Sequence, residues 1–358
     1  MSNIIQQVRP KLTLGIPVFN EIQHIGQTLN SIVLELANLN YNIEIIVSDN
    51  GSDDGSTKFL EKFATDFSQG NRVSFRLIKQ GINKGFNVNC DTIISSSNGE
   101  YLWVLGAQET LLPGALSEIG KFLDRGPRQL VVNAQVWDES TNCLANPHIY
   151  GLRKESYYTD CVDFYADLGG PCRSISLNIV KTDLVKRTLS IPIHSHYWGM
   201  FERHAHSCFM EGEGEGFVYI ATPIVRILIE EKGWQLSGED DFGTEIITRA
   251  FPGFYADIEM AEIGRRFLVY GKEIRNSIGV WRDQFGIVRT IITAKCTGLK
   301  VDPSLIWKMV KTYRDMPWFW ALGLPILFVP SAILNTKVLE NARAATHLVR
   351  AIFRMPAK

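Results

Sequence analysis

Four short polar segments of the sequence carry the side chains that could do chemistry. They are "PVFNE" (Pro17–Glu21), "SDNGSDDGS" (Ser48–Ser56), "NKG" (Asn83–Gly85) and "LGAQE" (Leu105–Glu109). Their amides and carboxylates can hydrogen-bond to a polar ligand, and carboxylates can also bind a divalent metal. Each segment alone is typical of an ordinary turn or helix cap, so its meaning depends on whether the fold brings the four together.

Three of the four polar segments lie at the end of an apolar stretch that predicts a buried strand. The other segment, "NKG", follows a predicted strand within a few residues. We expect strands at 12–18, 43–49, 73–80 and 100–105. Between them, apolar residues at helical spacing predict a helix over 22–36, capped by Asn20, and further helices from about 57 and after 83. This alternation predicts a mainly parallel sheet with helices on both faces, and ligands bind such sheets beyond the carboxyl ends of the strands. The four segments are therefore expected to meet in one crevice.

The rest of the chain gives coarser expectations. We expect a strand at 129–137, a strand running into a helix within 172–185, and a long strand or a strand pair at 215–231. From about Asp302 the pattern becomes helical, with Asp302 as cap and Pro303 in the first turn. A length of 358 residues suggests one large domain plus an appendage, which we place at 1–230 and 231–358.

In this order and spacing, the four segments resemble the nucleotide-binding half of family 2 glycosyltransferases, which have the GT-A fold. The resemblance covers residues 10–125 well, 126–230 loosely, and says little about the tail. It implies an α/β enzyme that moves a sugar from a nucleoside-diphosphate sugar to a glycan or lipid-linked acceptor in surface polysaccharide assembly. The alternative is a non-catalytic sugar-nucleotide or glycan binder that kept the crevice.

The resemblance also implies which residues contact the nucleotide: Pro17, Phe19, Asn20, Glu21, Asp49, Asn50, Asn83, Gly85 and Gln108. Asn50 stands where many members carry Asp to recognise the base edge, and its carboxamide offers both a donor and an acceptor. Asp49 could instead fix the loop. After "NKG" the family often continues to an Arg and an Asn, where this chain has Cys90 and Asp91.

The family's metal-binding acids are largely missing. The related pattern is an acid-x-acid triplet, and here its positions hold Ala107, Gln108 and Glu109. Only Glu109 keeps a hard oxygen ligand for Mg²⁺ or Mn²⁺, so we expect weakened metal dependence or partial replacement by a cation such as Lys84 or Arg173. The alternative role of Glu109 is to cap the turn.

Two acidic segments compete as the general base that an inverting transferase needs. "WGMFERHAHS" contains Glu202, at about the family's distance before a strand. "LSGEDDFGTEI" contains Asp240 and looks more like the usual acidic pair, but it follows that strand. Position favours Glu202, and the alternative for either segment is a solvated acidic surface.

The tail is basic and contains an uncharged stretch. Residues 286–358 hold eleven Lys or Arg against three acids, although the whole chain has a net charge of -1 and no bias toward nucleic acid. "MPWFWALGLPILFVPSAIL" (Met316–Leu334) has three prolines, which oppose a straight spanning helix. We expect 316–358 to form a broken hairpin and an amphipathic helix on an anionic membrane surface. The alternative is a packing element or an oligomer contact.

The expected location is the cytoplasm, peripheral to the inner face of the cell membrane. The first residues, "MSNIIQQVRPKLT", lack the apolar region of a signal peptide. The six cysteines include no CxxC pair, which favours free thiols in a reducing compartment.

Overall fold

The computed structural model describes most of the first two thirds of the chain and part of the tail. The described residues are 9–37, 39–67, 72–139, 141–168, 175–193, 199–210, 215–229, 300–331 and 333–334, with short helical pieces between 261 and 295. Contacts divide the chain into two compact units, Met1–Glu231 and Lys232–Lys358. Asp240 and Arg173, two residues singled out from the sequence, lie outside the described residues.

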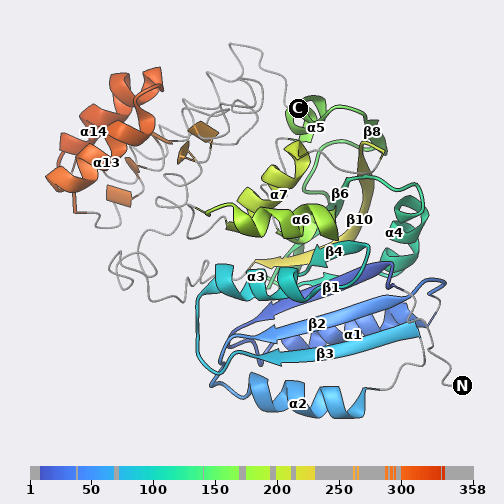
Figure 1. Ribbon diagram of the computed structural model, residues 1–358. Helices are drawn as coiled ribbons and strands as arrows, with labels where there is room; N and C mark the ends of the chain where they lie inside the picture. Colours follow the sequence, from blue (N-terminus) through green and yellow to red (C-terminus); the bar gives the residue numbers. More distant parts are fainter. Residues whose placement is uncertain are drawn as a thin grey trace, which may run out of the picture. The chain divides into compact units, whose positions relative to one another are not determined.

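The first unit is built on one sheet with the strand order β3-β2-β1-β4-β9-β6-β10-β5 (Figure 1). Its first half consists of four parallel strands: β1 (Leu12–Val18), β2 (Ile43–Asp49), β3 (Val73–Lys79) and β4 (Tyr101–Val104). β1, β2 and β4 are buried along their whole length, because helices cover both faces of a parallel sheet. The mainly parallel α/β architecture predicted from the sequence is confirmed.

Three helices connect these strands: α1 (Ile25–Leu36), α2 (Ser56–Asp66) and α3 (Phe86–Ser96). α1 and α3 lie on opposite faces of the sheet (Figure 1). α3 packs so closely on β1 that a Cβ built on Gly15 would lie 2.3 Å from a methyl carbon of Ile93. Cys90, which occupies the family's arginine position, is part of the apolar core under α3, and burial raises the pKa of its thiol.

The second half of the sheet continues beyond β4 with β9, β6, β10 and β5. β9 (Asn178–Lys181) is antiparallel to both β4 and β6 (Gln129–Asp138), so β6 runs parallel to β4. β10 (Phe217–Ile229) is a single long strand parallel to β6, and β5 (Thr110–Leu111) pairs antiparallel with it. The carboxyl ends of β6 and β10 therefore lie at the same edge as those of β1 to β4.

The remaining elements of the first unit are short. β7 (Cys143–Asn146) and β8 (Ser156–Tyr158) pair with β6 and β10. The helices are α4 (Ala115–Leu123), α5 (Cys161–Leu168), α6 (Thr182–Arg187) and α7 (Gly199–Phe209), with 3₁₀ turns η2 (Ile175–Leu177) and η3 (Thr188–Ser190). α6 and α7 pack with α3 against the sheet, and Met200 of α7 joins the core there.

The second unit contains α13 (Pro303–Tyr313), a π-helical turn η5 (Phe319–Gly323) and α14 (Leu324–Phe328). The Asp302 side chain accepts a hydrogen bond from the Leu305 N–H at 2.8 Å, which confirms the predicted cap. In the part of the chain that the structure describes, every helix is too short or too polar to cross a membrane.

Candidate active site

The predicted crevice lies where the parallel strands end. Val18 of β1 pairs with Asp49 of β2, and Asp49 pairs with Lys79 of β3, so the loops that follow these strands start side by side. Pro17 is buried as the second-last residue of β1, and Phe19 is partly exposed just beyond it. The register therefore starts the loops that carry three of the four polar segments at neighbouring points of one sheet edge.

The loop after β1 is tied to the loop after β2. Three of its backbone N–H groups donate to side chains of that loop: Asn20 to Ser52, Glu21 to Ser56 and Ile22 to Asp54, at 2.9, 3.0 and 2.9 Å. Although burial opposes it, the hydrogen bonds from Ser56 and the Ile22 N–H hold the pKa of Asp54 below its usual value. The two loops form one preorganised unit.

Asn20 does not cap the first helix, so that prediction is wrong. Its backbone has a positive φ of 56°, and its side-chain oxygen accepts from the Asp53 N–H at 3.0 Å. Asn tolerates this left-handed conformation better than most residues. α1 begins at Ile25 instead, after a turn in which the Ile25 N–H donates to the Glu21 carbonyl.

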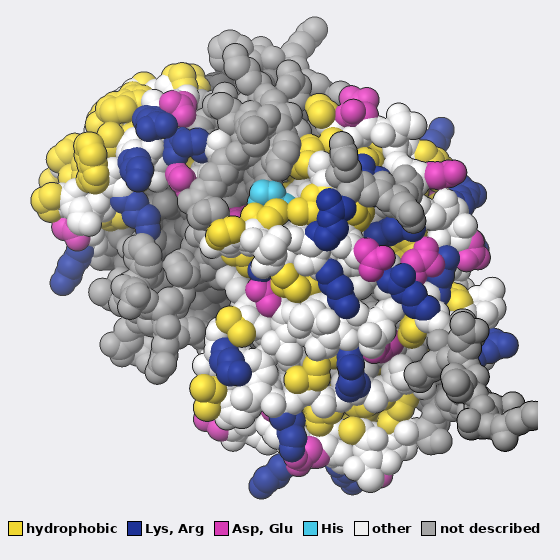
Figure 2. Space-filling model, viewed as in Figure 1, with side chains coloured by type: hydrophobic (Ala, Val, Ile, Leu, Met, Phe, Trp, Pro, Cys, Tyr) yellow, Lys and Arg dark blue, Asp and Glu magenta, His cyan; other side chains and the backbone are white. Residues whose placement is uncertain are grey.

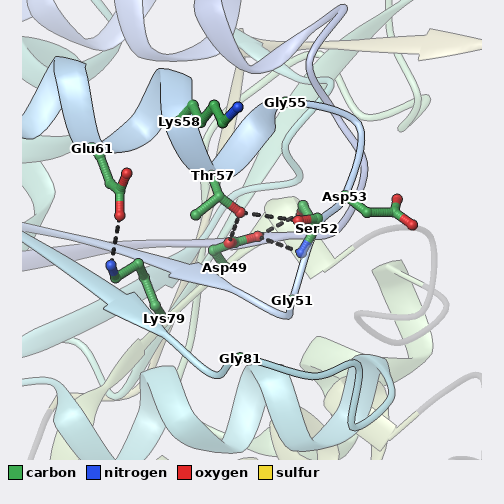
Figure 3. Close-up of a pocket in the computed structure, with 10 residues that line it drawn as sticks. All are labelled: Asp49, Gly51, Ser52, Asp53, Gly55, Thr57, Lys58, Glu61, Lys79 and Gly81. Atoms are coloured by element: carbon green, nitrogen blue, oxygen red, sulfur yellow. Dashed lines mark hydrogen bonds and ion pairs between the residues drawn. The ribbon is translucent and has the colours of Figure 1, made fainter.

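Asp49 is buried and fixes its own loop (Figure 3). One carboxylate oxygen accepts from the Ser52 hydroxyl at 2.5 Å, and the other accepts from the Thr57 hydroxyl at 2.6 Å. Beside it is an open pocket of about 600 Å³ between the ends of β2 and β3, where Lys79 forms an ion pair with Glu61 at 2.6 Å. Asp49 thus forms the loop hydrogen bonds expected of the alternative role, and its contact with the nucleotide stays a prediction.

Asn50 holds the "NKG" turn. Its side-chain nitrogen donates to Asn83 Oδ1 at 2.7 Å and to the Gly85 carbonyl at 3.3 Å, while its side-chain oxygen accepts from the Lys84 N–H at 3.0 Å. Gly51 follows with a φ of 78°, and a Cβ there would lie 2.7 Å from the Ile82 backbone, so only glycine fits this approach. Asn50, Asn83 and Gly85 thus form one cluster, and base recognition by Asn50 stays a prediction.

A hydrogen bond connects the fourth polar segment to the first. Gln108 Nε2 donates to Glu21 Oε1 at 3.1 Å. The other Glu21 oxygen lies 3.4 Å from His24 Nδ1, and His24 Nε2 lies 3.5 Å from a carboxylate oxygen of Glu139, beyond the end of β6. The sequence did not point to His24 or Glu139, because their proximity depends on where β6 ends.

Glu109 is turned inward. Its carboxylate accepts from the Gly106 N–H at 3.0 Å and from the Ser176 hydroxyl, and the residue is only 8% exposed. The Ala107 side chain has no atom that can bind a metal. The described residues include no group of three His, Cys, Asp or Glu arranged to hold a metal. The donor set of 107–109 therefore does not fit a carboxylate cage for Mg²⁺ or Mn²⁺.

A cationic residue stands opposite the strand that follows this segment. Arg226 of β10 stands opposite Thr110 of β5, two residues after Gln108, and its Cζ is 4.8 Å from the Trp137 ring centroid. Within the described ranges no carboxylate pairs with Arg226, and its Nε is buried without a hydrogen-bond partner. In the sequence, Arg226 differs from its surroundings in being the one cation of the mostly apolar strand "FVYIATPIVRILI".

Glu202 is buried on α7, whose first turn meets the first turn of α3. A Cβ built on Gly199 would lie 2.3 Å from Asn87 Oδ1, which places the start of α7 against the start of α3. Glu202 is 3% exposed, and its role as a base stays a prediction. Asp240, the rival, lies outside the described residues.

Of the two residues that follow Glu202, one links α7 to α3 and the other is buried. Arg203 forms two hydrogen bonds of 2.6 Å with the carboxylate of Asp91 on α3 and a third with the Thr188 carbonyl. Asp91 thus replaces the family's Asn with an ion-pair partner. Burial lowers the pKa of His204 to about 3, so this imidazole is neutral at physiological pH.

Comparisons with known proteins agree with this geometry. Residues 13–188 match the family "Glycosyl transferase family 2". The abequosyltransferase RfbV of Salmonella typhimurium is 26% identical over 235 residues, which cover 60% of this chain and 65% of that protein. The matched part is thus slightly less than two thirds of the relative's length.

Two solved structures share the fold at low sequence identity. The S. aureus TarS fragment 1–349 aligns with a TM-score of 0.51 and 14% identity over 88% of this chain and 89% of its own. The mannosyltransferase PcManGT of Pyrobaculum calidifontis, in complex with GDP-Man and Mn²⁺, aligns with a TM-score of 0.50 and 15% identity over 89% and 85%. Residues 13–188, which contain most of the parallel sheet and its polar strand ends, therefore form a domain that matches glycosyl transferase family 2, and its fold is the GT-A fold.

Proposed function

We propose that this protein is a glycosyltransferase that moves a sugar from a nucleoside-diphosphate sugar to a glycan or lipid-linked acceptor. The observation that carries the proposal is the joining of all four polar segments at one sheet edge, through the hydrogen bonds Asn20–Ser52, Asn50–Asn83 and Gln108–Glu21. The relatives support it: one is named an abequosyltransferase, TarS was solved with UDP-GlcNAc, and PcManGT was solved with GDP-Man. Polysaccharide assembly is the setting that these relatives favour.

In this proposal the nucleoside lies over the loop 17–21, and Phe19 and Asn20 contact its nucleobase and its ribose. The Asn50–Asn83 cluster lies at the adjacent strand end and includes the backbone of Lys84 and Gly85. Because these loops are already held by internal hydrogen bonds, little conformational entropy is lost when the ligand binds.

Transfer requires an acceptor hydroxyl to attack the anomeric carbon while the bond from that carbon to the diphosphate oxygen breaks. Glu202 would take the hydroxyl proton in an inverting reaction, with Asp240 as the rival base. Negative charge builds up on the departing diphosphate and must be stabilised. Since residues 107–109 do not fit a metal cage, we assign this role to the Arg226 guanidinium, assisted by the exposed Lys84.

A lipid-linked acceptor would place the enzyme peripherally on the inner face of the membrane, as the basic tail favours. Oligomer formation through the same tail is the rival arrangement.

A non-catalytic binder is the second candidate, and the inward-turned Glu109 is the observation that favours it. A thermal-shift screen of the full chain with UDP-, GDP-, dTDP- and CDP-sugars, with and without Mn²⁺, tests both. We expect one nucleotide class to raise the unfolding temperature, because a ligand that binds only the folded state stabilises it. Release of free nucleotide on addition of acceptor then indicates an enzyme, binding without turnover indicates a binder, and no stabilisation by any donor would refute both.

A further inference from the structure

In the second unit, the segment formed by α13, η5 and α14, which we call the hairpin, is held at its turn by contacts between its own residues. Tyr313 and Phe319 pack ring against ring with centroids 5.3 Å apart, and both are fully buried. Trp320 Nε1 donates to the Arg314 carbonyl at 2.8 Å, which ties the η5 turn to the end of α13. Leu305, Met309 and Leu327 complete the buried side. These contacts hold the end of α13 and the η5 turn together.

We call the large apolar side chains of this hairpin that are exposed to water its outer side. Six of them are exposed by at least 40%: Trp307 (70%), Phe328 (67%), Ile333 (61%), Trp320 (46%), Trp318 (40%) and Leu322 (40%). Figure 2 shows hydrophobic side chains gathered over the region of α13 and α14, with Lys and Arg beside them. Contiguous exposed apolar patches on soluble proteins mark interaction sites.

Cations share a face with the most exposed of these residues. Lys311 and Arg314 follow Trp307 by four and seven positions on or just beyond α13, so all three project to the same side, opposite Leu305 and Met309. Trp residues flanked by Lys and Arg are the composition that suits the headgroup region of a bilayer, where indoles settle and cations meet lipid phosphates. An ordinary protein interface is instead depleted in lysine.

We propose that the outer side of this hairpin, Trp307 to Ile333, docks on an anionic lipid bilayer. The indoles and Phe328 enter the headgroup boundary, and Lys311 and Arg314 contact lipid phosphates. Pro317, Pro325 and Pro330 keep the segment in short pieces that lie along the surface. The inference deepens the proposed function, since a lipid-linked acceptor lies at such a surface, but vesicle binding is measured without any sugar transfer.

Sedimentation of the full chain with vesicles tests this. We expect it to sediment with phosphatidylcholine vesicles that contain about 30% phosphatidylglycerol and to stay in solution with pure phosphatidylcholine, as expected when basic residues guide binding. Trp307→Ser combined with Phe328→Ser should weaken partitioning by about tenfold or more, because these two apolar side chains no longer enter the boundary. Lys311→Glu should also weaken binding, and added salt should reduce the wild-type signal.

Matched controls stand on the first unit. Leu34→Ser removes a leucine that is 69% exposed on α1, and Lys62→Glu reverses an exposed charge on α2; neither should change vesicle binding. The inference is overturned if wild type fails to sediment with anionic vesicles, or if the controls lose as much binding as the hairpin variants. It is also overturned if light scattering shows a dimer that Trp307→Ser/Phe328→Ser dissociates while vesicles are not bound. Vesicle binding by a chain that stabilises with no nucleotide sugar would keep this inference and remove the proposed function.

Discussion

The two sides of the candidate site use their polar atoms in opposite ways. On the side of β1, β2 and β3, Asp49 forms hydrogen bonds within its own loop, and Ser52 and Asn50 form hydrogen bonds to neighbouring loops. On the side of β5 and β10, the acids of the family pattern are replaced by Ala107 and Gln108, Glu109 is turned inward, and Arg226 has no carboxylate partner among the described residues. The first side is organised before a ligand arrives, whereas the second side offers an uncompensated positive charge.

This difference separates two kinds of mutational effect. Changes on the hydrogen-bonded side and its supporting helices should reduce stability, because buried groups lose partners. Changes at Arg226 should reduce transfer and leave folding almost intact, because a carboxylate partner is lacking among the described residues and the negative charge that Arg226 would stabilise grows on the diphosphate as it departs.

The largest effect is expected where α7 is fastened to α3. Arg203→Met leaves the Asp91 carboxylate without its two 2.6 Å hydrogen bonds, and we expect a loss of about 3 kcal/mol in the free energy of unfolding. Arg153→Met, at an exposed position, is the control, and urea unfolding measures both. A loss below about 1 kcal/mol for Arg203→Met would show that the pair does not fasten the helix.

At Arg226 we expect loss of activity rather than stability. Arg226→Gln should lower the transfer rate by about a hundredfold, because one group that stabilises the leaving diphosphate is gone. Arg125→Gln is a matched control, since that guanidinium also stacks on an aromatic ring, 5.1 Å from the Tyr157 centroid, outside the candidate site. Equal rates for wild type and Arg226→Gln, measured with the donor found by the screen, would remove Arg226 from the mechanism.

Acid should destabilise the protein through His204. Its pKa is about 3 in the folded chain and about 6.5 when unfolded, so below pH 6.5 the unfolded state binds the extra proton and stability falls as the pH drops toward 3. Between pH 7 and pH 5 this amounts to about 2 kcal/mol. His204→Gln should show a correspondingly smaller change over the same range in urea unfolding, and parallel losses for both proteins would contradict a buried neutral imidazole.

The first half of the sheet was predictable because its signals are local. Apolar runs that end in polar residues predicted β1 and β2 with their bounds, and the expected meeting of the polar segments agrees with the hydrogen bond between Asn50 and Asn83. The cap by Asp302 was likewise encoded within four residues. These features need only neighbouring residues and the rule that ligands meet the carboxyl ends of parallel strands.

The rest depends on distant pairings that a single sequence does not encode locally. Arg226 reaches the site only because β10 runs parallel to β6 and pairs with the two-residue strand β5. Asp91 looked like a departure from the family pattern until Arg203, more than a hundred residues away, supplied its partner. Asn20 was misassigned as a helix cap because its left-handed backbone is set by the loop around Asp53.

The most direct test of the account is a calorimetric titration of the matching nucleoside diphosphate, in EDTA and in Mn²⁺. Wild type should bind with affinities that differ by less than about threefold between the two conditions, because 107–109 provide no carboxylate cage. Ala107→Asp combined with Gln108→Asp restores two hard ligands and should gain about tenfold or more in affinity from Mn²⁺. If wild-type binding instead requires Mn²⁺ and Glu109→Ala abolishes it, the metal cage survives in this chain and the assignment of its charge to Arg226 is wrong.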